Sequence, residues 1–230
     1  MATYEIPNET GNILSGVILL AEDTMVIKDG GEAQDTTVDD GRLNVDDGGY
    51  ASKTLVSSGG YMRVSNGAIA SNTTVGSNGS MWVGATGSAG ETTMSGWGGS
   101  MNILGLATDV QVTGGGSMTV ANGGTVKNAN LIENGYALLQ NGATGNNVSV
   151  GLGGYLSVDN GATATIVEDG GQVNVLAGAN AVFANHTFSD LVIPYNYTTT
   201  VHSGTTAFAV KDNGLMMVCG GYASGTVVDS

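Results

Sequence analysis

Apolar residues recur in this chain at two distances, two residues apart within a short segment and about nineteen residues apart between segments. Met62 and Val64 flank Arg63, and one period later Met81 and Val83 repeat the pattern. A spacing of two is that of a β-strand with one buried side, and no segment shows a sustained 3.6-residue helical period. The pattern therefore predicts many short strands that repeat at a fixed interval.

Two apolar columns follow this interval along the chain. The first contains Met25, Leu43, Met62, Met81, Met101, Met118, Ala137, Leu156 and Val173, with spacings of 18, 19, 19, 20, 17, 19, 19 and 17 residues. The second runs two residues later, through Ile27, Val45, Val64, Val83, Ile103, Val120, Leu139, Val158 and Val175. Such a period is the signature of a solenoid, because one coil cannot bury its apolar face without neighbouring coils.

Glycine-rich turns separate the predicted strands, for example at 46–49, 57–60 and 133–135. Glycine, Asn and Asp adopt positive φ at low cost, so we assign these segments to corners. Nineteen residues at about 3.3 Å each give roughly 60 Å of chain, enough for three short strands and three corners. We therefore predict an all-β, right-handed parallel β-helix with about 19 residues per coil.

The period also divides the chain. We expect residues 1–11 to form an N-terminal extension or cap and residues 12–230 a single β-helix domain, which we interpret as a fragment of a longer repeat array. The repeat breaks at 183–202, which holds both histidines. This segment is either a loop that leaves the rod and presents Tyr195 and Tyr197 to a partner, or an irregular coil in which Phe188, Leu191 and Ile193 pack inward.

Two inward stacks are predicted from the columns. Six of the nine methionines should form one stack, namely Met25, Met62, Met81, Met101, Met118 and Met216. A copper-binding methionine box is the alternative, and the Leu, Ala and Val residues in the same column argue against it. A second stack runs through Thr36, Thr54, Thr73 and Thr92 and continues as Val110, Ala129 and Val148. We expect its hydroxyls to be buried and hydrogen-bonded to a neighbour or to backbone, whereas an exposed ice-binding array would not switch to valine.

Charge and cysteine content narrow the class of protein. The formal net charge of −14 excludes a nucleic-acid surface, since little here could displace phosphate counterions. Acidic residues crowd the first 47 positions, either as solvated corners or, as the minority interpretation, as calcium ligands. The single cysteine, Cys219, cannot form an internal disulfide. The apolar run at 17–21 is too short to span a membrane, and we expect no nucleic-acid partner, no metal and no cofactor.

The candidate binding residues are aromatic and basic. Tyr61 and Arg63 flank Met62, and Trp82 follows Met81, so Arg63 should lie beside Trp82 at strand spacing and form a cation–π contact that could stack on sugars. Scattered exposed side chains are the simpler explanation. His186 and Asp190 could form an acid–base pair, but no nucleophile accompanies them, and we expect no catalytic residue.

The unit x-Ala-x-x-Thr-x-Val-x-x-Gly-Gly-x-Met-x-Val-x-x-Gly-Gly, nearly intact over 31–64, resembles the passenger repeats of AIDA-type autotransporter adhesins. The resemblance covers about 12–182 and resumes at 203–230. It implies export to the outer surface of Gram-negative bacteria and a role in adhesion to host cells or glycans, self-association and biofilm formation. Some members are heptosylated on Ser and Thr of the repeats.

The leading hypothesis is therefore a non-enzymatic, adhesin-like protein at the bacterial cell surface. A β-helical polysaccharide lyase or hydrolase is an alternative, which would need a carboxylate cluster around Asp40 or Asp47 with a basic residue. A passive structural spacer within a large surface protein is the third.

Overall fold

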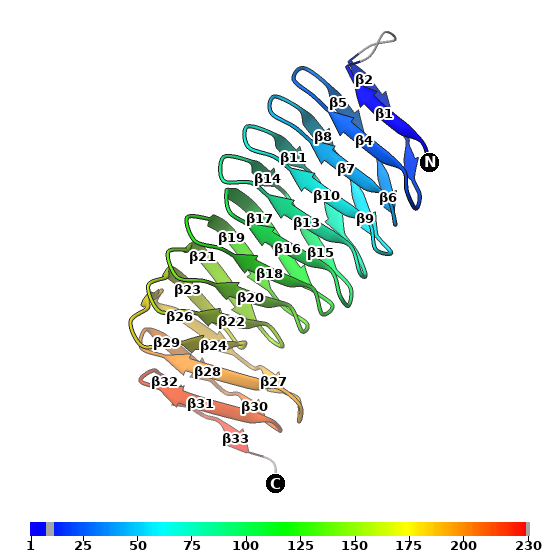
Figure 1. Cartoon of the computed structure of the whole chain (residues 1–230). Helices are drawn as coiled ribbons and strands as arrows, with labels where there is room; N and C mark the ends of the chain where they lie inside the picture. The colour runs from blue at the N-terminus through cyan, green and yellow to red at the C-terminus, as the bar shows by residue number, and fades with distance from the viewer. Residues whose placement is uncertain (8–11, 229–230) are drawn as a thin grey trace.

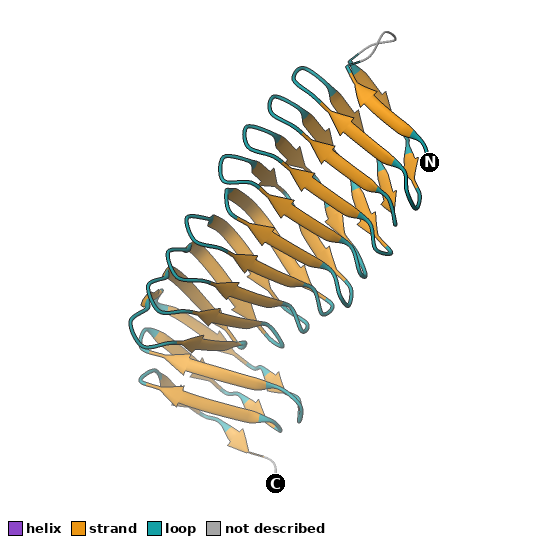
Figure 2. Ribbon diagram, viewed as in Figure 1, coloured by secondary structure: helices purple, strands orange, loops and turns teal. Residues whose placement is uncertain are grey.

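The computed structural model describes residues 1–7 and 12–228. Within these residues every regular element is a β-strand and none is a helix, and the strands stack into a solenoid of about twelve coils (Figures 1 and 2). Every pair of these strands is parallel. The predicted all-β parallel β-helix is confirmed.

A ten-stranded sheet forms one side of the rod. Each coil contributes one four-residue strand: β1 (Thr3–Ile6), β4 (Thr24–Ile27), β7 (Arg42–Val45), β10 (Tyr61–Val64), β13 (Ser80–Val83), β16 (Ser100–Ile103), β18 (Ser117–Val120), β20 (Tyr136–Leu139), β22 (Tyr155–Val158) and β24 (Gln172–Val175). The strand β1 pairs with β4, so residues 3–6 of the expected N-terminal extension belong to this sheet, and residues 8–11 lie outside the described residues.

A fifteen-stranded sheet forms the remaining sides. Its first column holds β2 (Ile13–Ser15), β5 (Glu32–Gln34), β8 (Tyr50–Ser52), β11 (Ile69–Ser71) and β14 (Ser88–Gly90). Its second column holds β3 (Ile18–Leu19), β6 (Thr37–Asp39), β9 (Leu55–Ser57), β12 (Thr74–Val75) and β15 (Thr93–Ser95). The two columns merge into longer strands at β17 (Leu106–Thr113), followed by β19 (Thr125–Leu131), β21 (Thr144–Gly151), β23 (Thr163–Asp169) and β25 (Asn180–Phe183).

The core is built from the predicted columns. Met62 pairs with Leu43 on one side and Met81 on the other, and the register continues through Met101, Met118, Ala137 and Leu156 to Val173. All of these side chains are buried. Successive layers of one apolar shaft thus account for the nineteen-residue period.

Met216 is a correction to the predicted methionine stack. It is only partly buried and packs against a separate C-terminal cluster of Phe188, Ile193, Val201, Ala207 and Val210. The strand that carries it pairs with residues 198–202, so Met216 lies beside Thr199. The additional residues between β24 and this strand break the column.

The repeat break at 183–202 forms strands and not a protruding loop. β26 (His186–Ser189) begins a three-stranded sheet with β29 (Thr205–Phe208) and β32 (Tyr222–Ser224). β27 (Val192–Ile193) pairs with β30 (Lys211–Asp212) and then β33 (Val227–Val228), while β28 (Thr198–His202) pairs with β31 (Leu215–Cys219). Phe188 and Ile193 are buried, so the irregular-coil interpretation is correct and the loop interpretation is wrong.

The threonine stack is buried as predicted, but its hydroxyls are not satisfied. Thr36, Thr54, Thr73 and Thr92 are each 1% exposed, and within the described part of the chain their Oγ1 atoms have no hydrogen-bond partner. Backbone groups here are already used between coils, as in the bond from the Thr74 N–H to the Thr54 carbonyl. Neighbouring hydroxyls are one coil apart, about 4.8 Å, which is beyond hydrogen-bond distance. The expectation that they would be satisfied is therefore wrong.

Replacing Thr73 by valine is expected to stabilise the protein by about 1 kcal/mol, because a buried, unpartnered hydroxyl costs free energy and the same column already holds Val110 and Val148. Urea denaturation would measure the change. Thr74→Val, the outward neighbour, is the matched control and should change the free energy of unfolding by less than about 0.5 kcal/mol. A destabilised Thr73→Val variant would show that the hydroxyl does form a hydrogen bond.

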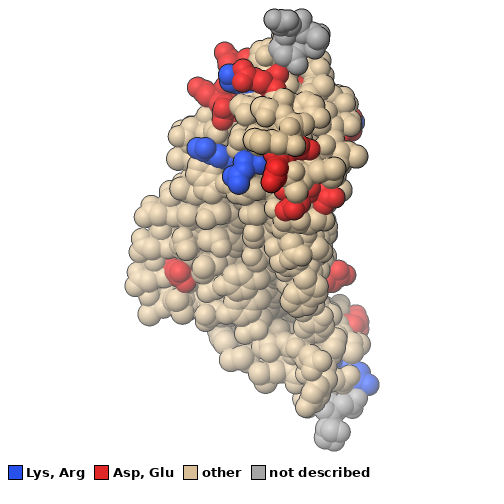
Figure 3. Space-filling model, turned by 45° about the vertical axis from the view of Figure 1, so that its right-hand side comes forward, with Lys and Arg blue, Asp and Glu red and all other residues tan. Residues whose placement is uncertain are grey.

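Charge is uneven along the rod. Acidic and basic side chains gather toward the N-terminal end of the face in Figure 3, and most of the remaining surface in that view is uncharged.

No helix among the described residues is long and apolar enough to cross a membrane.

Candidate functional site: an arginine–aromatic face and a buried carboxylate

Inward and outward side chains alternate along each strand of the ten-stranded sheet, and this places Tyr61, Arg63 and Trp82 on its outer face. Because Met62 and Val64 point inward, Tyr61 and Arg63 point outward, and Arg63 is paired with Trp82 of the next coil. The Arg63 Cζ atom lies 5.2 Å from the centroid of the Trp82 ring. The expected cation–π geometry is present.

A second pair of the same kind lies one coil earlier. Arg42 and Tyr61 are paired across β7 and β10, and the Arg42 Cζ atom is 5.2 Å from the Tyr61 ring centroid. We call Arg42, Tyr61, Arg63 and Trp82 the arginine–aromatic cluster. Sequence reasoning found three of its members and missed Arg42, although Arg42 precedes Leu43 as Tyr61 precedes Met62.

A shallow polar hollow of about 340 Å³ adjoins this cluster. Besides Tyr61 and Trp82 it is lined by side chains of Ser80, Ser100, Asn102, Ser117 and Thr119. The hydroxyls of Ser100 and Ser80 are 3.2 Å apart and hydrogen-bonded. Flat rings beside hydroxyl and amide groups form a surface on which a sugar ring can stack and also form hydrogen bonds.

Two stacked tyrosines follow further along the same face. The Tyr136 and Tyr155 ring centroids are 5.4 Å apart with an interplanar angle of 9°. Burial raises the pKa of Tyr136, and the neighbouring Tyr155 and Asp159 raise it further. In this outward column, three serines of successive coils therefore lie between Tyr61 and the Tyr136–Tyr155 pair.

The structure separates the other two candidate residues. Tyr195 is 86% exposed, whereas Tyr197 is half-buried against the C-terminal core cluster and lies against Gly153. Neither joins the arginine–aromatic cluster, since both follow β27 at the far end of the chain. Their role in binding stays a prediction.

A buried carboxylate was missed by sequence reasoning. The run Glu168, Asp169 and two glycines is typical of a corner, but Glu168 is an inward residue of β23, paired with Val150, and it is fully buried. It stands where the preceding coils have Leu131 and Val150, so it ends an otherwise apolar column. The signal that could have revealed it is the alternation Ile166, Val167, Glu168 in register with Val148, Ser149, Val150.

The segment 198–202 supplies the hydrogen bonds that Glu168 needs. Its Oε1 accepts a bond from Thr200 Oγ1 at 2.8 Å and lies 2.6 Å from His202 Nδ1, while its Oε2 accepts the His202 backbone N–H at 2.7 Å. A carboxylate is an acceptor, so Nδ1 must carry a proton. The His202 ring also stacks on Phe183, with centroids 4.3 Å apart.

Opposing effects act on Glu168. Burial raises its pKa, but the hydrogen bonds from His202 and Thr200 and the nearby imidazole together hold the pKa below its usual value. Glu168 is therefore a fastening between the main solenoid and the C-terminal coils, because its hydrogen-bond partners Thr200 and His202 belong to β28.

Of the remaining chemical alternatives, the His186–Asp190 pair is not formed, whereas carboxylates and a basic residue do gather near Asp40. His186 Nε2 lies 3.3 Å from Asp169, and no contact joins His186 to Asp190 within the described residues, so that acid–base pair is wrong. Asp40 lines a hollow of about 240 Å³ with Glu22, Asp23 and Arg42, and Asp47 lies elsewhere. Hydrogen bonds from the N–H groups of Ala2 and Leu20 hold the pKa of Asp23 below its usual value.

The described residues contain no group of three or more His, Cys, Asp or Glu side chains that could hold a metal ion. Five of the methionines suggested for copper are buried layers of the core.

Comparisons with known proteins agree with the fold. Residues 45–99 match the family described as "Adhesin of bacterial autotransporter system, probable stalk", and this stretch includes Arg63 and Trp82. No curated protein matches the chain. The structure is similar to the "Crystal structure of TibC-catalyzed hyper-glycosylated TibA55-350 fragment", with a TM-score of 0.62 and 24% identity over 99% of this chain and 92% of that one. Residues 45–99 are thus similar to an adhesin stalk, so the predicted resemblance to AIDA-type repeats is confirmed, and the chain as a whole shares the fold of the solved fragment.

Proposed function

We propose that this chain is a non-enzymatic stalk segment at the bacterial cell surface, and that its arginine–aromatic cluster mediates self-association or attachment to glycans of host cells. The observation that carries the proposal is the pair of arginine–ring contacts on one outer face of the solenoid, of which Tyr61, Arg63 and Trp82 lie within the stretch that matches the adhesin stalk family. A rigid stack of coils holds these groups at fixed spacing, which favours repeated weak contacts.

The test is clumping by a non-adherent bacterium that displays the chain. Clumped cells should sediment at least several-fold faster than cells without it, and the double variant Arg63→Ala/Trp82→Ala should lose most of that gain, because stacking and cation–π contacts each contribute about 1 kcal/mol or more. Purified protein should in parallel bind a panel of host-cell glycans, or sediment as an oligomer.

Asn174→Ala is the matched control. Asn174 is exposed in the same outward column as Arg63 and Trp82 and lies outside the cluster. It should clump like the unmodified chain. A displayed, folded chain that neither clumps nor binds cells or glycans would instead support the passive spacer.

A further inference from the structure

One corner of the solenoid is shorter than its neighbours. The turns that lead from the ten-stranded sheet into the first column of the other sheet have four residues in the neighbouring coils, at 65–68, 84–87, 121–124 and 140–143. Between β16 and β17 the turn has only Leu104 and Gly105. The row of corners therefore has one recessed position.

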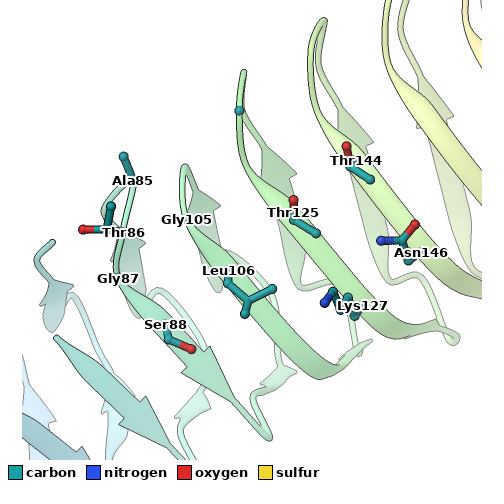
Figure 4. A pocket seen from close by; sticks show the side chains of 11 residues that line it. Ala85, Thr86, Gly87, Ser88, Gly105, Leu106, Thr125, Lys127, Thr144 and Asn146 are labelled. Atoms are coloured by element: carbon teal, nitrogen blue, oxygen red, sulfur yellow. The ribbon is translucent and has the colours of Figure 1, made fainter. Parts of the chain in front are cut away.

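The recess is forced by tight packing. A Cβ on Gly105 would lie 2.2 Å from the Gly84 carbonyl oxygen and 2.4 Å from the Gly87 carbonyl oxygen, so the short turn lies flat against the preceding coil. The full corners on either side are two coils apart, about 10 Å. The result is a notch whose walls are the corners at 84–87 and 121–124 (Figure 4).

The notch opens onto the outer face of the fifteen-stranded sheet as a hollow of about 520 Å³. Its floor carries Ser88, Leu106, Thr125 and Thr144 in one outward column and Lys127 and Asn146 in the next. It lies on a different sheet from the arginine–aromatic cluster.

Lys127 is the one Lys or Arg of the described residues without an internal partner. Lys28 pairs with Glu5 and Lys53 with Asp35. Arg42 and Arg63 lie over aromatic rings, and Lys211 has a contact of its own. An unpaired ammonium group in a protein of net charge −14 is suited to an anionic ligand.

The surroundings favour a sugar over a bare anion. Within the described residues the side chains of Ser88, Thr125, Thr144 and Asn146 form no hydrogen bond, so their donors and acceptors are available. Glu91 and Asp109 occupy the corners that follow β14 and the first half of β17, and their charges weaken the attraction for a simple anion. A ligand that also uses the hydroxyl and amide groups overcomes this.

We propose that this notch binds a saccharide that carries a carboxylate. The carboxylate pairs with the Lys127 ammonium group, ring hydroxyls form hydrogen bonds with Thr125, Thr144 and Asn146, and the apolar face of the ring lies on Leu106. Uronic acids and sialic acids share this chemistry.

The experiment is an NMR titration of the ¹⁵N-labelled chain with D-glucuronic acid and, separately, N-acetylneuraminic acid. Shifts confined to the notch residues and saturating at millimolar concentration are expected for at least one of them, and the relative affinity distinguishes the two sources. D-glucose and sodium acetate should bind at least about tenfold more weakly, since each lacks one half of the recognised chemistry.

Two variants make the test specific. Lys127→Gln should weaken binding by about tenfold or more and remove its salt dependence, whereas Lys53→Gln, on a different corner, should change nothing. Inserting Asn-Gly after Leu104 restores a four-residue corner and should abolish binding with Lys127 still present. Absence of binding at about 10 mM, equal binding of acetate, or unchanged affinity in Lys127→Gln would each overturn the proposal.

Discussion

Replacing His202 by alanine is expected to destabilise the C-terminal coils by about 3 to 5 kcal/mol, because it leaves the buried Glu168 carboxylate without its imidazole partner. Hydrogen–deuterium exchange of residues 198–228 should accelerate by a factor of about a hundred or more, while exchange in the coils before β23 changes little. Loss of the Phe183 stack adds to the effect.

His186→Ala is the matched control. It removes the other histidine–carboxylate contact of this region, but Asp169 is exposed, so the cost should stay below about 1 kcal/mol. Equal effects of the two alanine variants would contradict the fastening role of Glu168.

The same fastening makes the C-terminal coils sensitive to acid. The pKa of Glu168 is lower in the folded chain than its ordinary value of 4.5. Its contribution is therefore fully present above that value and is lost as pH falls below it toward the folded pKa. Exchange in 198–228 should rise steeply in this acidic range, and Glu168→Gln should be destabilised at neutral pH with a much weaker acid dependence.

The second large loss of stability is expected when one methyl group is added at Gly124. Gly124→Ala should cost about 3 kcal/mol, because its Cβ would lie 2.3 Å from the Ile103 carbonyl oxygen and 3.0 Å from the Ala121 carbonyl oxygen, both of them backbone atoms. Thermal unfolding would measure this loss.

Gly123→Asn provides the control at the adjacent position. Gly123 has φ of +81°, a Cβ added there would have no atom of the described residues within 4 Å, and asparagine tolerates such a conformation. It should cost about 1 kcal/mol or less. If the two substitutions lowered the free energy of unfolding equally, the close approach of successive coils would not explain why glycine occupies position 124.

The layered core could be predicted from the sequence because each layer obeys the same local rule. Met62 and Val64 point inward, as do the residues at the same two positions of the neighbouring strands. A shift of one residue in the register would move both side chains from the core into water. The contact between Arg63 and Trp82 followed from the same alternation, since outward neighbours in parallel coils lie one strand spacing apart.

The features that the sequence did not predict, namely the burial of Glu168, the position of Met216 and the short corner, depend on how individual coils pack against one another. Glu168 looks like a turn residue beside Asp169 and two glycines, and the partners that allow its burial, Thr200 and His202, lie more than thirty residues later in the chain. Met216 obeys the local pattern, but its strand pairs with β28 in a sheet separate from the ten-stranded sheet, which ends at β24. The notch had a signal in the 17-residue spacing from Met101 to Met118, which did not say which corner was short.

The most direct test of the layered solenoid is a pair of spin-label distances in a Cys219→Ser background. Seven strand pairings lead from Asn44 through Arg63, Trp82, Asn102, Thr119, Leu138 and Ser157 to Asn174. Labels at Asn44 and Asn174 should give a narrow distribution near about 34 Å, and labels at Arg63 and Asn174 one near about 29 Å, a difference of about one layer. Broad distributions, or a difference unlike one strand spacing, would contradict the stacked coils on which the binding surfaces depend.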